Sequence, residues 1–216
     1  MRLAKLIELS RESELSQLSA VHKTDQKMVG YVNRAVIALY NKFPLRVEEA
    51  FVTLVDNKHL YRLDGSDTDV KVDGIAMGEY DLVQITEVWD EVGKLPLNDD
   101  SDPFAVFTPD SDSIHVSKAE TGNYVSVMFR ASHDWITYVD DGNGNATDTE
   151  VRVPQPMIEA LLMYVAYKAY DSLDDAQSNK AEKYLARYRE QLVEIQNDGL
   201  VASDSSNRDV QVKGFD

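Results

Sequence analysis

Apolar positions along the chain follow two different periods, and the change between them separates helical from strand-like sequence. From Met28 to Lys42 the apolar residues return every three or four positions, which predicts an amphipathic helix. Pro44 ends this helix, because proline restricts the residue before it and has no N–H for the helical ladder. Residues 2–9 show similar spacing. We therefore expect helical structure on the N-terminal side of residue 47.

Residues 47–153 carry short apolar and β-branched runs that are separated by Gly, Asn and Asp turns. Runs of this kind at close spacing predict the antiparallel strands of a small sandwich or barrel-like domain. The expected strands are 47–55, 59–63, 69–72, 81–89, 103–107, 113–118, 123–130, 135–139 and 149–153.

Helical spacing returns at Pro154 and continues to Gln196, with a polar loop at 174–179, which predicts a two-helix hairpin. The tail at 197–216 is polar and has no helical period. It is either disordered or an extended arm that orders on a partner, and the alternation of Val210, Val212 and Phe215 favours the arm.

The pattern as a whole predicts an α+β protein, in which a helical bundle is interrupted by an inserted antiparallel β domain and followed by an extended C-terminal arm. We expect N-terminal bundle helices at 1–46, the β domain at 47–153, the hairpin that completes the bundle at 154–196 and the arm at 197–216.

The first helix of the hairpin, 157–173, is apolar nearly all round, so it must be covered on more than one side. We expect it to pack within and between subunits through Ile158, Leu161, Leu162, Val165, Tyr167 and Tyr170. The hairpin tyrosines fit two interpretations equally well, because tyrosine is common in interfaces and also lines cores with its hydroxyl at the edge.

The chain has 216 residues, with 38 acidic and 22 basic side chains and a formal net charge of −16. This balance argues against a free surface that binds nucleic acid, which needs lysine and arginine to displace counterions from phosphate. It is compatible with the wall of a channel past which DNA slides, because negative charge repels phosphate. Simple solubility explains it equally well.

The absence of cysteine excludes disulfides, cysteine-bound zinc and thiol catalysis. The N-terminal residues are charged throughout and lack an apolar signal core, and no run reaches the length of a membrane span. We expect synthesis in the cytoplasm and no membrane contact.

Motifs for chemistry are also missing. A calcium loop that begins at Asp141 would place Ala146 where the turn needs glycine and Arg152 where a carboxylate must bind. The four histidines have no metal-like spacing, and the glycines at 142 and 144 lack the residues of a phosphate loop. We therefore expect no catalytic site, metal or cofactor, and a protein that is not an enzyme.

The segment VNRAVIALYNKFPLRVEEAFVTL resembles the head-to-tail adaptors of tailed bacteriophages, of the gatekeeper or tail tubular A class. In these proteins a helix ends in an FPL-like exit that leads directly into the first strand. The β insertion, the Pro-marked return and the helical hairpin fit the same layout. The matching residues are Asn33, Ala35, Leu39, Tyr40, Phe43, Pro44 and Leu45.

The resemblance implies a structural virion protein at the head–tail junction, made in the host cytoplasm. Its copies would form a ring, typically of twelve, between the portal and the tail or nozzle protein, and DNA would pass without sequence-specific binding. Helical bundles would pack side by side, the β domain would face the tail, and the arm with Val210, Val212 and Phe215 would contact the portal.

Three other hypotheses stay open at this point. A tail completion or terminator protein would share the ring but lie lower in the particle. A virion-associated hydrolase would need paired carboxylates, which thirty-eight acids supply by chance. A monomeric binding module would recognise a carbohydrate or peptide with its β domain.

Overall fold

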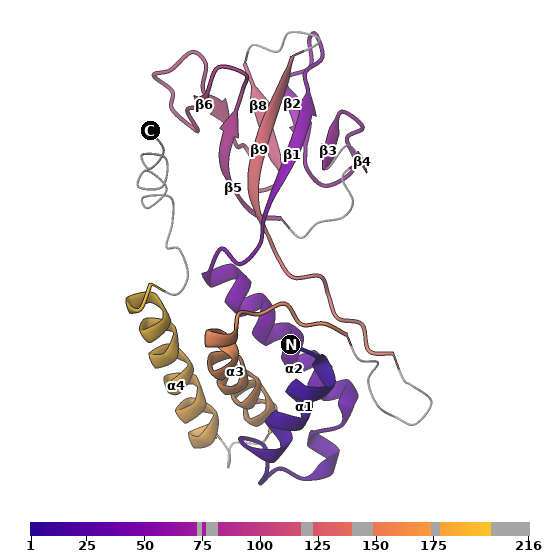
Figure 1. The fold of residues 1–216 in the computed structure, drawn as a ribbon, viewed down its shortest axis with the longest axis vertical. Helices are drawn as coiled ribbons and strands as arrows, with labels where there is room; N and C mark the ends of the chain where they lie inside the picture. Colours follow the sequence, from indigo (N-terminus) through magenta and orange to yellow (C-terminus); the bar gives the residue numbers. More distant parts are fainter. Residues whose placement is uncertain (73–74, 77–81, 118–122, 140–148, 174–177, 200–216) are drawn as a thin grey trace, which may run out of the picture. The chain divides into compact units, whose positions relative to one another are not determined.

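The computed structural model describes residues 1–72, 75–76, 82–117, 123–139, 149–173 and 178–199. The chain divides into two compact units, which are described separately (Figure 1). The helical unit combines Met1–Leu45 with the chain from Trp135 onward, and the β unit spans Arg46–Asp134.

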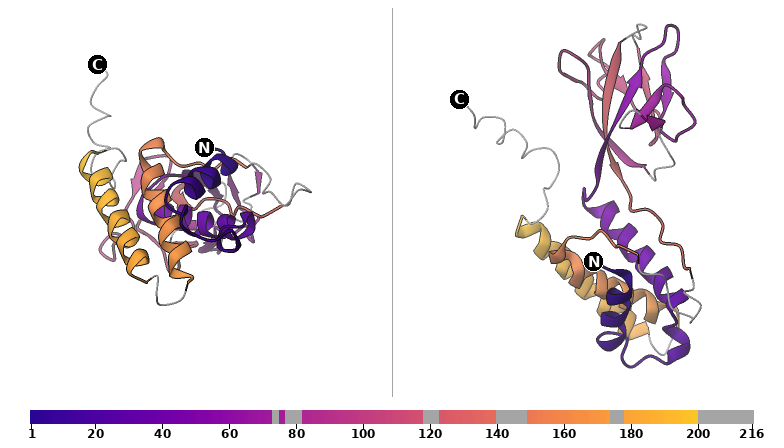
Figure 2. Two further views of the ribbon diagram at one scale, coloured as in Figure 1. Left: turned by 90° about the horizontal axis from the view of Figure 1, so that it is seen from below. Right: turned by 45° about the vertical axis from the view of Figure 1, so that its right-hand side comes forward.

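The helical unit is built around its most apolar helix. Helix α3 lies between α2 and α4, and α1 also packs against it (Figure 2). This central position explains why α3 is apolar on nearly every side. The helices of the unit are α1 (Leu3–Glu12), η1 (Ala20–His22), α2 (Asp25–Lys42), η2 (Gln155–Met157), α3 (Ile158–Asp171) and α4 (Ser178–Asn197).

Helix α2 contributes the stripe that its spacing predicts. Met28, Val32 and Leu39 are fully buried in one hydrophobic core with Leu161 and Val165 of α3. The helix ends at Lys42, where the Phe43 N–H still bonds the Leu39 carbonyl at 2.8 Å before Pro44 takes the chain out of the helix.

Tyrosine rings join α3 to α4. Tyr164 meets Tyr188 edge to face with ring centroids 4.8 Å apart, and Tyr170 stacks on Tyr184 at 5.5 Å. The hydroxyls of Tyr170 and Tyr184 both donate to the Glu14 carbonyl, each at 3.2 Å. Burial raises the pKa of Tyr188 to about 12. The hairpin tyrosines therefore form part of the subunit's own core.

A buried asparagine holds the returning chain against α2. Asn33 Nδ2 donates to the Ile136 carbonyl at 2.8 Å, and the Ile136 N–H donates to Asn33 Oδ1 at 2.9 Å. Both residues are buried. One side chain thus satisfies both backbone groups of Ile136, as a neighbouring strand would.

The prediction of strands at 135–139 and 149–153 is therefore wrong. Both stretches are extended, but they lie in the helical unit and form no strand in the described residues apart from a single bridge at Glu150. Their alternating residues Ile136, Val151 and Val153 are buried in the helical core. The alternation of apolar and polar residues arises because one side of each extended segment is buried, and helices rather than a second sheet cover that side.

The β unit is a sandwich of two antiparallel sheets. The larger sheet has the order β4-β3-β1-β9-β5-β6 and the smaller has the order β2-β8-β7. The strands are β1 (Val47–Thr53), β2 (Leu60–Arg62), β3 (Val70–Val72), β4 (Ile75–Ala76), β5 (Leu82–Trp89), β6 (Lys94–Leu95), β7 (Val106–Phe107), β8 (Ser113–Val116) and β9 (Tyr124–Ala131).

The two sheets share a core of their own. Val52 and Phe129 from the larger sheet and Tyr61 and Ile114 from the smaller one are completely buried in it. The Tyr61 hydroxyl accepts the Val55 N–H at 2.9 Å and donates to the Lys58 carbonyl at 3.0 Å. The buried hydroxyl of this ring is therefore paired, and it fixes the turn between β1 and β2.

The predicted α+β class, with a helical bundle and an inserted antiparallel β domain, is confirmed. Seven expected strands are present, and the short β4 and β6 were not anticipated. The expected β domain ran to Val153, whereas the compact unit of strands ends at Asp134. The expected arm at 197–216 lies outside the described residues from residue 200 onward.

Replacement of the buried asparagine tests its role in the fold. We expect Asn33→Ala to lower the free energy of unfolding by about 2–4 kcal/mol, because it leaves the N–H and carbonyl of Ile136 buried without partners. Urea denaturation measures the change. Gln26→Ala, on an exposed position of the same helix, serves as the control and should stay close to wild type. Equal stabilities of the two variants would contradict the assignment.

Alkaline pH tests the burial of Tyr188. An unfolded tyrosine loses its proton near pH 10 and the folded one at about pH 12. The unfolded state therefore binds fewer protons in this window, and stability falls as pH rises through it. We expect Tyr188→Phe to lose less stability than wild type between pH 10 and 12, as measured by urea denaturation at each pH. Tyr124→Phe, at an exposed position, should behave as wild type; a Tyr188→Phe variant that does the same would refute the prediction.

Candidate interaction surfaces

The residues predicted for packing on α3 fall into two groups. Leu161, Leu162, Val165 and Tyr170 are buried inside the helical unit. Ile158 and Tyr167 are only partly buried, and Tyr167 packs against the edge of the helical core. The residues predicted to contact the portal lie outside the described residues: Val210, Val212 and Phe215.

The outer face of the larger sheet carries exposed aromatic side chains. Phe51, Trp89 and Tyr124 are 39%, 40% and 46% exposed, and Phe51 meets Tyr124 edge to face at 6.4 Å. The strand register places one row across this face, in the order Lys71, Phe51, Ser126, Trp89 and Lys94. We call Phe51, Trp89 and Tyr124 the aromatic face of the β unit.

Polar groups on the aromatic face are paired with one another. Glu87 accepts from the Trp89 indole at 3.0 Å and from Lys94 Nζ at 3.2 Å, and Ser126 donates to Glu49. The indole is thereby held in place with its ring exposed. A fixed aromatic ring with satisfied polar neighbours is typical of a protein–protein contact.

Sequence reasoning did not identify the aromatic face. Phe51 and Trp89 each stand next to an inward-facing valine, Val52 and Val88, so the strands read as apolar on both sides. Apolar residues at both parities of these strands were the available signal, since a half-buried strand normally alternates apolar with polar residues.

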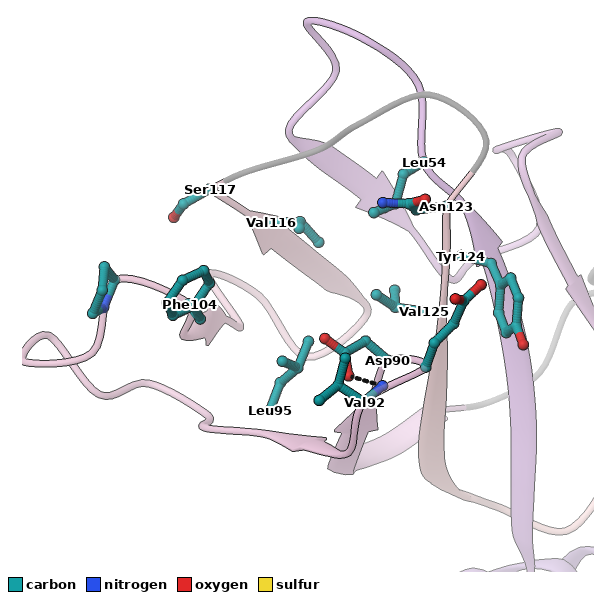
Figure 3. A pocket seen from close by; sticks show the side chains of 12 residues that line it. Leu54, Asp90, Val92, Leu95, Phe104, Val116, Ser117, Asn123, Tyr124 and Val125 are labelled. Carbon is teal, nitrogen blue, oxygen red and sulfur yellow. Dashed lines mark hydrogen bonds between the residues drawn. The ribbon is translucent and has the colours of Figure 1, made fainter.

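A small pocket lies at one end of the β unit, between β6, the start of β9 and the loop around Phe104 (Figure 3). Its volume is about 190 Å³, below the range of about 300–1,000 Å³ of small-molecule sites. The Asp90 carboxylate accepts the N–H groups of Val92 and Gly93, both at 2.8 Å, so it serves the turn. Apolar residues such as Val92, Leu95 and Phe104 share the lining with polar ones such as Glu91 and Asn123.

The aspartate-rich turns near residues 64 and 99 use their carboxylates locally. Asp64 accepts from the N–H and hydroxyl of Ser66, and Asp99 accepts from the same groups of Ser101. These hydrogen bonds, the one from the serine hydroxyl foremost, lower the pKa of each carboxyl group. Such contacts are those of Asx turns.

Over the described ranges, no group of three or more acidic or histidine side chains is arranged to hold a metal ion. Most of the stretch that was compared with a calcium loop, 140–148, lies outside them. In the same ranges no helix is both long and apolar enough to cross a membrane.

Comparison with known proteins assigns the chain to a family. The sequence profile of the SU10 adaptor protein family matches residues 1–211. No curated protein matches the chain significantly. The match spans both the helical unit and the β unit, so it confirms the predicted relationship at the level of phage adaptors. The chain therefore belongs to the SU10 adaptor protein family and is a structural adaptor of the phage virion.

Proposed function

We propose that this protein is a head-to-tail adaptor, whose copies form a ring between the portal and the tail around the channel through which DNA leaves the capsid. The observation that carries the proposal is the match to an adaptor family over residues 1–211, which includes both compact units. Identical subunits that make one heterologous contact close into a ring. We propose twelve copies, as in the adaptors that the sequence resembles.

The arm supplies the contact with the portal in this proposal. Val210 and Val212 are two positions apart, so they can face the same side of an extended peptide, and Phe215 adds an aromatic side chain three positions further on. An arm that orders on its partner buries these side chains on binding and loses conformational freedom at the same time. Ile158 and Tyr167 of α3 would add contacts between subunits.

The aromatic face supplies the contact with the tail or nozzle protein. Exposed tryptophan and tyrosine give large contact areas at little entropic cost, and such residues dominate binding energy in many interfaces. The net charge of −16 suits a channel wall, because carboxylates repel the phosphates of passing DNA and prevent it from adhering.

Assembly with the portal protein of the same phage tests the proposal. We expect the full chain to add a ring to isolated portals, visible by negative-stain electron microscopy. Combined Val210→Ser, Val212→Ser and Phe215→Ser should weaken binding by about tenfold or more, since each buried anchor contributes more than about 1 kcal/mol. The control combines Asn207→Ser, Gln211→Ser and Lys213→Ser. A protein that stays monomeric with portals would contradict the adaptor function.

Tail joining tests the aromatic face. We expect Trp89→Ala and Tyr124→Ala to form the ring on the portal normally and to reduce the joining of tails to adaptor-bearing heads by about tenfold. Particle counts by electron microscopy measure both steps. Thr53→Ala, an exposed substitution on β1, is the control. Normal tail joining by both aromatic variants would show that another surface meets the tail.

A further inference from the structure

Helix α2 has a positive balance of charge in a strongly acidic chain. It carries Lys27, Arg34 and Lys42 against a single carboxylate, Asp25, which gives a balance of three to one. Asp25 is paired with Arg11 of α1 at 2.5 Å, so it offsets little of the charge on the exposed side. Arg34 is exposed and directly follows Asn33.

The extended segment held by Asn33 presents a tryptophan beside this helix. Trp135 is 60% exposed, while its neighbour Ile136 is bonded through both backbone groups. Among the described residues the Trp135 indole N–H has no hydrogen-bond partner. Val139 is also exposed, and because it is four positions after Trp135 it lies on the same side of the extended segment. We call Arg34, Trp135, Thr137 and Val139 the Trp135 face.

The opposite side of the helical unit has a complementary surface. The side of α4 that faces away from α3 carries a shallow, open groove, whose described lining comes from the C-terminal half of this helix and the residue that follows it. Val193, 55% exposed, lies in it, and three carboxylates line it. We call this surface the α4 groove; its residues are Arg189, Glu190, Val193, Glu194, Asn197 and Asp198.

The two surfaces lie on opposite sides of one compact unit. Helix α3 separates α4 from α2, and the segment at 135–139 runs along the side of α2 away from α4 in all three views (Figures 1 and 2). Two different surfaces in this arrangement suit a heterologous contact, in which each copy offers one surface to each neighbour.

We propose that the Trp135 face of one copy docks into the α4 groove of a second copy, and that this contact builds the ring. Three features of the surfaces agree with a second copy as the occupant. The indole can pack on Val193, its N–H can donate to a groove carboxylate, and Arg34 brings positive charge to a groove with three carboxylates and one arginine. The inference rests on the proposed adaptor function, since it names the surfaces that join neighbouring subunits.

The chain has no cysteine, so introduced pairs give unambiguous cross-links. Thr137→Cys and Asn197→Cys are both placed at exposed positions, one on each surface. In rings formed on portals and then oxidised, the double variant should give a ladder of covalent multimers. A mixture of the two single variants should give dimers, and each single variant alone should give none. The control pair combines Thr137→Cys with Ser101→Cys in the β unit.

Substitution provides an independent measurement. We expect Trp135→Ala and Val193→Glu each to raise the protein concentration needed for ring formation by about tenfold or more. Trp135→Phe should have a smaller effect, and Val92→Ala, at an exposed position of the β unit, should have none.

The outcomes separate this inference from the proposed function. Rings that form on portals without the expected cross-links, and that tolerate Trp135→Ala, would overturn the inference and leave the adaptor function in place. Thr137→Cys that links to itself, to the portal or to DNA-bearing particles would also overturn it, because the Trp135 face would then have another occupant. A wild-type chain that forms no ring with portals would overturn both.

Discussion

The structure depends on the need to bury α3 on several sides at once. A helix with apolar residues around most of its circumference cannot be covered by one neighbour, and here α1, α2 and α4 share the task. Two of these covering helices precede α3 by more than a hundred residues. The β unit is therefore an insertion into a helical core whose parts are distant in the sequence, and that core can close only when the helices on both sides of the insertion are present.

Asn33 supplies hydrogen-bond partners for the chain segment that returns from the β unit to the helices. The chain that returns from the β unit is extended, and an extended segment laid against helices has backbone groups without a ladder to join. An asparagine carries an NH2 donor group and a carbonyl acceptor on one planar amide, which matches the two backbone groups of a single residue. The sequence resemblance included Asn33, and the structure supplies a physical reason for an amide at this position.

Periodicity was sufficient to predict the α-helices, the strands of the sandwich other than the short β4 and β6, and the α+β class. It failed where alternation had a different cause: Ile136, Val151 and Val153 alternate because helices bury one side of an extended chain. It also could not distinguish outward from inward aromatic residues, because Phe51 and Val52 look equally apolar in sequence. The apolar excess of α3 suggested neighbouring subunits, whereas most of its residues are buried by the same chain.

The two hydrophobic cores have no residue in common. A substitution inside the sandwich therefore changes the packing of the sandwich without disturbing the residues that pack around α3, and the reverse also holds. For a family of adaptors this separation has an evolutionary consequence. The β unit can accumulate changes, or be replaced by another insertion between Leu45 and Trp135, while the helical core keeps its own selection pressure and its own rate of divergence.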